Sequence, residues 1–566
     1  MGRRRGERIE VTPSAFSVAR GVRSEAHLKA ARAQAGELTW SMIMGRATVD
    51  EQVEGLRYLH KRGSESGFVI DRGMVIPDWT SGLPPALRAH VPKGTSFLLS
   101  GEEDHRRIAQ AAPLSPAFCD WHIGSPYCVE NTAAAIAAGA SSHGVLAQFA
   151  WDLPLVKDDV ASIMENVTAI GMVAARRDEW LFVDSYMDDG MPNRFVDNAS
   201  LVGYAMLEKY VVDDLCGARY ATGFGGLISD IPTKVGVWLA LHEVLKAEHP
   251  GLSYLYGNTL SPSETDTEQN YGVIGPEMAV FAAVETRMRT GVSLLPTPIT
   301  EKIEVPPPQA IFEARMVAGK AAERGAELGR LLDWPAIERL RDTLVQHGRA
   351  FFANAIELLK ANGVDVGDPL QVLLALRRIG AHRLELLCHP SVARDPTAEL
   401  VPCVPTELLS MAQEMAAAEL AGIKAGGLEG SMRGKRFLVA SADTHWYGAY
   451  AVTTVLRALG ADVVDAGSEC GAEELADAAR RQSIENIAVS AHNGQCLTYG
   501  TRLAELLEAD GLPRNIYVGG KLNAILDGAT EPSDMCERLR EAGLVPCRTV
   551  LDLVEQSAKA GPLATG

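Results

Sequence analysis

Short apolar runs alternate with helical patterns through much of the chain. Between residues 39 and 308, apolar or glycine-rich runs such as 181–183 and 253–256 are separated by segments with helical periodicity, such as 132–140 and 234–246. This alternation of strand and helix predicts a parallel sheet. About 270 residues follow the pattern, close to the roughly 250 that an eight-stranded barrel takes, so we expect a (β/α)8 barrel of the TIM type.

A helical stretch and a glycine-rich segment follow the predicted barrel. Helical periodicity dominates residues 308–425, and we expect these helices to be additions to the barrel. They end at Gly426-Gly427-Leu428-Glu429-Gly430, a composition typical of a flexible junction. The predicted organisation is an N-terminal extension at 1–38, a barrel domain with a helical C-terminal region at 39–425, a linker at 426–432 and a C-terminal domain at 433–566.

The C-terminal domain shows a second α/β pattern. Expected strands lie at 436–440, 462–465, 486–490 and 515–518, with helices at 447–459, 472–481 and 501–509. This order predicts a doubly wound, Rossmann-like or flavodoxin-like domain, whose ligands bind beyond the carboxyl ends of the strands. Polar residues and glycines fall at or just past those ends, namely Asp443, His445, Ser490, Gly519 and Gly520. We therefore expect a ligand site at this edge of the sheet.

Charge and composition narrow the partners. The 566 residues carry a net charge of -18, which disfavours a broad nucleic-acid-binding face. No apolar run reaches the ~18 residues that a membrane span needs, and the N-terminus lacks the apolar segment of a signal peptide. Nine cysteines without regular spacing are typical of reduced core thiols rather than of a disulfide framework or a zinc site. We expect a cytoplasmic protein that binds a small molecule, and neither nucleic acid nor membrane.

The spacing Asp443-x-His445-x-x-Gly448 points to a bound metal. An imidazole that ligates a metal normally donates its other ring N–H to a carboxylate, and Asp443 is two residues away from His445. Gly448 would let a bulky planar group approach the backbone, and the pair Gly519-Gly520 would admit a long buried substituent. A single histidine after a strand is more often a surface or core residue, and a glycine pair is more often a turn. Their coincidence at one sheet edge favours a site.

The same residues resemble the signature of cobalamin-binding domains, which is DxHxxG, SxL and GG. It appears here as Asp443-x-His445-x-x-Gly448, Ser490-Ala491-His492 and Gly519-Gly520. The resemblance implies that His445 is the lower axial ligand of the cobalt, in place of the dimethylbenzimidazole tail, with Asp443 as its hydrogen-bond partner. It also implies that Ser490 meets the displaced tail and that the glycine pair lines the slot. His492 departs from the usual leucine and would add a polar contact near the tail.

The N-terminal part is similar to the catalytic subunit of glutamate mutase. The run at 45–59 resembles an early barrel helix, and further similarity lies at 124–126, 223–225 and 293–313. The resemblance implies an adenosylcobalamin-dependent carbon-skeleton mutase, with the catalytic barrel fused to its cobalamin domain. In such enzymes the cobalt–carbon bond breaks homolytically and starts a radical rearrangement. The resemblance also implies that Glu301 hydrogen-bonds the adenosine ribose, and it leads us to expect a homodimer through the barrel.

The substrate-binding residues of that family are not kept in this chain. The three arginines that hold its dicarboxylate fall at Ile43, near 77–78 and at His122, its ammonium-binding glutamate near Val145, and its two tyrosines near Trp151 and Leu155. A carboxylate without a partner in a buried pocket would cost several kcal/mol, so we expect a less charged substrate than glutamate. We predict Glu301 and His122 as catalytic residues, and His122 and Trp151 as substrate contacts.

Three function classes fit these patterns. A radical isomerase is favoured because the barrel similarity keeps the order of the mutase. A corrinoid-dependent methyltransferase and a non-catalytic B12 carrier or sensor are the alternatives. The preferred upper ligand of the cobalt would separate them. The substrate, the migrating group and the choice between isomerisation and elimination stay open.

Overall fold

The chain forms two compact units, residues Met1–Thr406 and Glu407–Gly566. The structure is a computed structural model, and it describes residues 1–91, 93–153, 155–245, 251–394, 400–443, 445–468, 470–492, 494–509, 515–524 and 533–559. Each unit has hydrophobic clusters of its own. None of the helices in these ranges has an apolar stretch long enough to cross a membrane.

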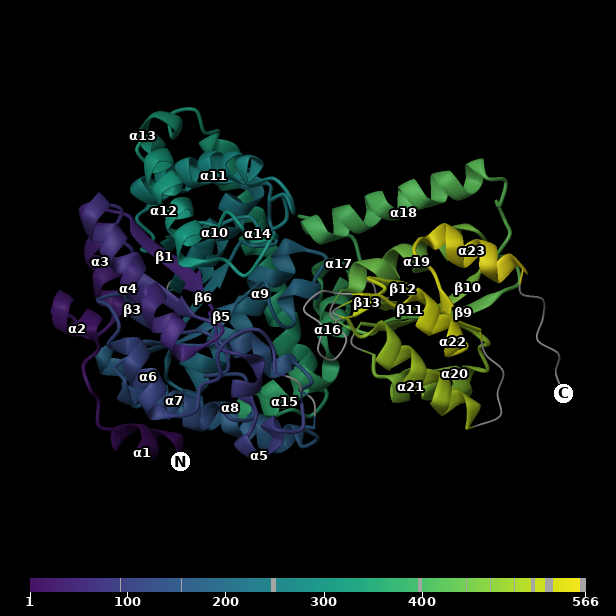
Figure 1. The fold of residues 1–566 in the computed structure, drawn as a ribbon, viewed down its shortest axis with the longest axis horizontal. Helices are drawn as coiled ribbons and strands as arrows, with labels where there is room; N and C mark the ends of the chain where they lie inside the picture. The colour runs from purple at the N-terminus through teal and green to yellow at the C-terminus, as the bar shows by residue number, and fades with distance from the viewer. Residues whose placement is uncertain are drawn as a thin grey trace. The chain divides into compact units, whose positions relative to one another are not determined.

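In the described part of the first unit, eight parallel strands close into a barrel in sequence order. Figure 1 shows strands β1, β3, β5 and β6 of this barrel among the helices of the unit. The strands are β1 Thr39–Met44, β2 Arg72–Val75, β3 Ser115–Phe118, β4 Ser142–His143, β5 Phe182–Tyr186, β6 Arg219–Phe224, β7 Gly251–Tyr256 and β8 Ser293–Leu295. Closure comes from β8 pairing with β1, where Thr39 lies opposite Ser293. The predicted (β/α)8 barrel is confirmed.

Helices connect the strands, and further helices follow the last strand in the chain. Those before β8 are α1 Gly2–Glu7, α2 Ala15–Arg20, α3 Glu25–Ala35, α4 Val49–Ser66, α5 Pro85–Arg88, α6 Glu102–Ala109, α7 Cys128–Ala137, α8 Asp159–Ala174, α9 Asn198–Lys209, α10 Ile231–Leu245 and α11 Thr267–Met288. Those after β8 are α12 Pro308–Ala322, α13 Gly325–Leu328, α14 Trp334–Ala361, α15 Pro369–Ile379, α16 Ala381–Cys388 and α17 Pro390–Arg394. The expected helical additions therefore follow the last barrel strand.

The first 38 residues form helices α1–α3 before the first barrel strand β1, and they pack as part of the barrel unit. Helix α1 lies against α8 so closely that a Cβ at Gly2 would overlap the carbonyl oxygen of Thr168. Arg3 donates a hydrogen bond of 2.7 Å from Nη2 to the carbonyl oxygen of Cys216. The basic N-terminus is thus anchored to the barrel unit through α8 and the carbonyl group of Cys216.

A buried charge network fills the N-terminal end of the barrel. Arg72, the first residue of β2, places Nη2 2.6 Å from Oδ2 of Asp184 and Nε 3.2 Å from Oε2 of Glu25. Lys29 places its Nζ 2.6 Å from the other oxygen of Glu25. Removing one member of such a network costs about 3–5 kcal/mol, because a buried charge loses its partner. This end of the barrel serves stability, and the opposite end is the one where barrel enzymes place their active sites.

The second unit contains a five-stranded parallel sheet with the order β10-β9-β11-β12-β15. Its strands are β9 Arg436–Ser441, β10 Asp462–Gly467, β11 Asn486–Ala491, β12 Asn515–Gly520 and β15 Val545–Pro546, and a small hairpin joins β13 Asn523–Ala524 to β14 Ser533–Asp534. Its helices are α18 Glu407–Ala425, α19 Trp446–Ala458, α20 Ala472–Gln482, α21 Cys496–Glu508, α22 Cys536–Glu541 and α23 Val550–Lys559. In chain order the sheet reads 2-1-3-4-5, which is the flavodoxin-like order.

The boundary between the units lies before α18, about twenty residues earlier than the expected linker at 426–432. Ala416 and Ile423 of α18 are buried in one cluster with Phe437 of β9 and Val455 of α19. The apolar stripe of α18 therefore belongs to the C-terminal core, and the boundary expected after residue 425 is corrected. The glycine-rich segment forms a turn inside this unit, where Gly427 has a φ of 77°.

The cysteines are unpaired in both units. All nine are free thiols, and most are buried. The prediction of reduced core thiols rather than a disulfide framework is confirmed.

Candidate functional site

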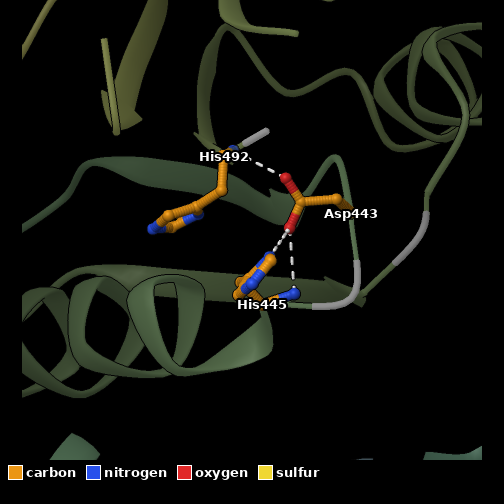
Figure 2. Close-up of side chains that lie close together, drawn as sticks. All are labelled: Asp443, His445 and His492. Carbon is orange, nitrogen blue, oxygen red and sulfur yellow. Dashed lines mark hydrogen bonds and ion pairs between the residues drawn. The ribbon is translucent and has the colours of Figure 1, made fainter. Parts of the chain in front are cut away.

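Two neighbouring strand ends of the second unit bring the predicted site residues together. Strands β9 and β11 pair in parallel, with Ser441 opposite Ser490, so the loops that follow them leave the same edge of the sheet. The first loop carries Asp443 and His445, and the second begins with His492 (Figure 2). Helix α19 starts directly after His445.

Asp443 holds the site by accepting hydrogen bonds on both carboxylate oxygens. Its Oδ1 lies 2.7 Å from Nδ1 of His445 and 2.9 Å from the backbone nitrogen of the same residue. Its Oδ2 accepts the backbone N–H of His492 at 2.6 Å. Burial alone would raise the pKa of Asp443, but the bonds from His445 and His492 outweigh it and hold that pKa below its usual value. The carboxylate is ionised at neutral pH.

His445 has one nitrogen fixed and one available. Because an ionised carboxylate can only accept, the proton of this hydrogen bond lies on Nδ1, and Nε2 is the ring nitrogen left for another partner. The side chain is 33% exposed, and Nε2 has no hydrogen bond to any described residue. The arrangement presents an oriented imidazole whose Nε2 can ligate a metal.

His492 lies beside His445 without a hydrogen bond between the rings. The ring centroids are 4.8 Å apart, and Tyr447 stands edge-on to the His445 ring at 5.8 Å. The ligand-type atoms of Asp443, His445 and His492 all lie within 4.8 Å of one another. Since both oxygens of Asp443 already accept N–H groups, the group is better described as one oriented imidazole with a second imidazole next to it.

A narrow cavity of about 230 Å³ opens next to these residues, within the second unit. A Cβ at Gly448 would overlap Oγ of Ser490, and a Cβ at Gly520, which has a φ of 95°, would overlap the carbonyl oxygen of Ala491. A β-carbon at either position therefore requires a neighbour to move, and the positive φ of Gly520 favours glycine there in any case. Gly519 also lines it, and a Cβ there would stand 3.3 Å from the carbonyl oxygen of Cys547.

The cavity contains buried polar atoms without partners. Oγ of Ser490 and Nδ1 of His492 are buried and have no hydrogen bond to the described residues. Leaving a buried polar group unbonded costs about 1–3 kcal/mol, so both atoms are suited to a ligand that supplies the missing bonds. Burial lowers the pKa of His492, which keeps its ring neutral.

The structure places all of the sequence-predicted cofactor residues at this site and adds others. The cavity is lined by Gly448, Ser490, Gly519 and Gly520. Asp443 and His445 lie in the loop after β9, at the same edge of the sheet. The cavity is also lined by residues that sequence reasoning missed, namely Met415, Glu419, Tyr447, Tyr517, Lys521 and Arg548. Lys521 directly follows the glycine pair, which was an available signal. Met415 and Glu419 were missed because α18 was assigned to the barrel domain.

Glu301 of the first unit lines a cavity of about 480 Å³ at the barrel's C-terminal end. The cavity also includes Ile43 and Met44 at the end of β1, Ile76 just after β2 and Tyr256 at the end of β7. The hydroxyl of Tyr256 donates to Oε1 of Glu301 at 3.2 Å. Burial raises the pKa of Glu301, and the Tyr256 hydrogen bond opposes that rise.

His122 and Trp151, the predicted substrate contacts, do not line this cavity. The His122 ring is fully buried, with Nδ1 2.7 Å from the carbonyl oxygen of Asp120 and Nε2 2.8 Å from Nε2 of His105. Both ring nitrogens are thus occupied by the protein, and the geometry does not support His122 as a catalytic or substrate-binding residue. Trp151 is half-buried and packs edge-to-face on Trp121 at 5.6 Å.

Comparisons with known proteins add little to this picture. No protein-family model and no curated protein matches the chain. Among solved structures, it is similar to the 1.5 Å crystal structure of a novel cobalamin-binding protein from Desulfitobacterium hafniense DCB-2. The two share 17% sequence identity over 27% of this chain and 82% of that chain, with a TM-score of 0.20. A TM-score this low establishes neither a shared fold nor a shared function.

Proposed function

We propose that this protein is an adenosylcobalamin-dependent radical isomerase of the carbon-skeleton mutase type, acting on a small substrate other than glutamate. We assign cofactor binding to the C-terminal unit and substrate conversion to the barrel. The observation that carries the proposal is the Asp443–His445 pair, with its free Nε2, beside a cavity that Gly448 and Gly520 keep open.

The residues present fit a cobalamin whose nucleotide tail is displaced from the cobalt. Such binding needs an imidazole with one ring nitrogen fixed and the other free, and Asp443 fixes Nδ1 of His445. It needs a slot for the tail, which the glycines provide. It also needs a hydrogen-bond donor inside the slot, and the buried hydroxyl of Ser490 is one without another partner among the described residues.

When bound, adenosylcobalamin supplies the radical that starts the rearrangement. The barrel's own residues orient groups and exclude water. Glu301, whose carboxyl is held by Tyr256, can hydrogen-bond a hydroxyl group in the cavity at the strand ends. Part of the barrel is a buried apolar cluster that includes Met74, Val145 and Leu295, and such a cluster helps to keep water from a reactive species.

The charges at the barrel's C-terminal cavity support a substrate other than a dicarboxylate. Ile43 lines the cavity where the resembled family has an arginine. The charged side chains that line the cavity are Glu301, Glu304 and Lys302, and Lys302 donates its Nζ to the carbonyl oxygen of Leu260 at 2.5 Å. A substrate carboxylate would meet two acidic groups and no guanidinium there, and bidentate guanidinium pairing is hard to replace.

The test begins with the cobalt ligand. Full-length protein labelled with ¹⁵N-histidine is loaded with cob(II)alamin, and its EPR spectrum is expected to show hyperfine coupling to one ¹⁵N nucleus. The His445→Ala variant is expected to lose that coupling. If the coupling persists in the variant, the assignment of the ligand fails.

The reaction class is tested with the loaded wild-type protein and a pool of small metabolites. We expect a radical EPR signal that requires both adenosylcobalamin and substrate, together with an isomerised product. Transfer of a methyl group from methylcobalamin to an acceptor would replace the proposal by a methyltransferase. Tight binding with neither reaction would replace it by a carrier.

A further inference from the structure

We propose that the cavity beside His445 selects the base of the corrinoid's nucleotide tail, and that His492 makes it prefer a purine, adenine, over dimethylbenzimidazole. The inference rests on the proposed function, because it presupposes a corrinoid whose tail enters this cavity. It goes further by assigning the tail chemistry to one side chain of this chain.

Ser490 and His492 each contribute a polar atom without a hydrogen-bond partner among the described residues to the lining of one cavity. Ser490 lies in β11 and His492 is the first residue after that strand, so the two side chains come from the same strand end. A Cβ built on Gly448 would overlap Oγ of Ser490 and would stand 3.8 Å from Cε1 of His492, the carbon between its two ring nitrogens. Both side chains line the cavity.

Burial makes those two atoms depend on a ligand. Ser490 is 4% exposed and His492 is 9% exposed, and neither Oγ nor Nδ1 has a hydrogen-bond partner among the described residues. The backbone N–H of His492 is used by Asp443, but that bond leaves the ring free to serve another group. A tail that enters the cavity excludes water, so it has to satisfy both atoms.

The two bases differ in what they can offer. Dimethylbenzimidazole attached to its ribose has one free ring nitrogen and an apolar edge with two methyl groups, so it can bond Ser490 or His492 but not both. Adenine has several ring nitrogens and an exocyclic amino group, so it can accept from one and donate to or accept from the other. A site built to hydrogen-bond a ligand rejects an analogue that leaves its buried polar groups unpaired. A leucine in place of His492 would remove the second polar atom that needs a hydrogen-bond partner.

The test measures binding of three corrinoids to the full-length apoprotein by absorbance and by competition: cobalamin, its adenine-tailed analogue and cobinamide, which lacks the nucleotide tail. We expect the wild type to bind the adenine-tailed corrinoid about tenfold or more tightly than cobalamin. His492→Leu is expected to remove that preference and to leave cobinamide affinity unchanged. His492→Gln keeps a hydrogen-bonding group of similar reach, so it is expected to retain part of the preference for the adenine-tailed corrinoid. It keeps the inference testable if the leucine variant does not fold.

The outcomes separate this inference from the proposed function. Equal wild-type affinities for the two tailed corrinoids, both with histidine bound to cobalt, would overturn the role of His492 and leave the cobalamin site intact. A preference that survives unchanged in His492→Leu would overturn it as well. If no tailed corrinoid binds with histidine as cobalt ligand, the proposed function fails first.

Discussion

Oδ1 of Asp443 lies 2.7 Å from Nδ1 of His445 and also accepts that residue's backbone N–H at 2.9 Å. One oxygen therefore fixes both the position of the loop and the tautomer of the ring. The second oxygen reaches the backbone of His492, which follows the neighbouring strand. The carboxylate thus joins two strand-end loops while it aims Nε2 of His445 outward.

Asp443→Asn is expected to weaken cobalamin binding by about 10–100-fold, because the ring loses a charged partner that fixes its orientation and raises its basicity. Titration of the apoprotein followed by absorbance would measure it. Asp465→Asn is the matched control, since Asp465 accepts only the backbone N–H of Gly467 among the described contacts, and an asparagine can still accept it. Equal losses in both variants would contradict a specific role for Asp443.

Gly448→Ala is expected to close the tail slot, because the new methyl group would overlap Oγ of Ser490. Affinity for cobalamin should fall at least about tenfold, while cobinamide, which has no nucleotide tail, should be affected much less. Gly471→Ala is the control, as a Cβ at Gly471 meets no atom within 4 Å. An unchanged cobalamin affinity in Gly448→Ala would show that the tail lies elsewhere.

The cofactor site could be predicted from sequence because its parts are local. Asp443 and His445 are two residues apart, and the glycine pair ends its strand, so periodicity and spacing alone placed them at one edge of the sheet. Parallel strands end at the same edge whatever packs around them. The contributions of Met415 and Glu419 could not be predicted in this way, because the apolar stripe of α18 does not specify which unit covers it.

The barrel site was predicted less well because its residues come from distant strands. Glu301 and Ile43, which were named for different roles, line one cavity. His122, in contrast, forms a hydrogen bond with His105 of α6, with 2.8 Å between their Nε2 atoms. That partner is set by the packing of α6 against β3, and a single sequence carries no signal for it.

Purified protein with adenosylcobalamin is expected not to interconvert glutamate and 3-methylaspartate at a measurable rate. The physical reason is that Ile43 and Val145, both in or next to the barrel interior, give no charged partner to the two ends of that substrate. NMR of the reaction mixture would check it. Robust conversion of glutamate would show that other side chains bind its carboxylates.

Glu208→Gln is expected to change how the stability of the barrel unit depends on pH. Burial raises the pKa of Glu208 to about 7, and the hydroxyl of Tyr220 donates to it at 2.7 Å. Because the folded state holds this proton more tightly, the contribution of Glu208 to stability falls as pH rises from about 4.5 to 7, by roughly 3 kcal/mol in total. The glutamine variant lacks that loss. Urea unfolding of both proteins at pH 4.5 and 8 would measure it, with the exposed Glu338→Gln as control.

A fragment of residues 407–566 is expected to fold and bind cobalamin, whereas a fragment of 426–566 should be much less stable. The difference is α18, whose Ala416 and Ile423 are buried with Phe437 and Val455. A fully buried isoleucine alone contributes about 1.5–3 kcal/mol, and removal of the helix also exposes the apolar groups that it covers. Circular dichroism and denaturant unfolding of the two fragments would compare their stabilities.

The same idea can be tested in the full-length protein. Ile423→Ala is expected to lower the free energy of unfolding of the C-terminal unit by about 2–5 kcal/mol, because it removes buried methyl groups and leaves a cavity. Lys424→Ala changes the neighbouring exposed residue and should have little effect. Cobalamin affinity should also fall in Ile423→Ala, since Met415 and Glu419 of the same helix line the cavity. If the 426–566 fragment is as stable as the 407–566 fragment and Ile423→Ala costs nothing, then α18 does not belong to the C-terminal core.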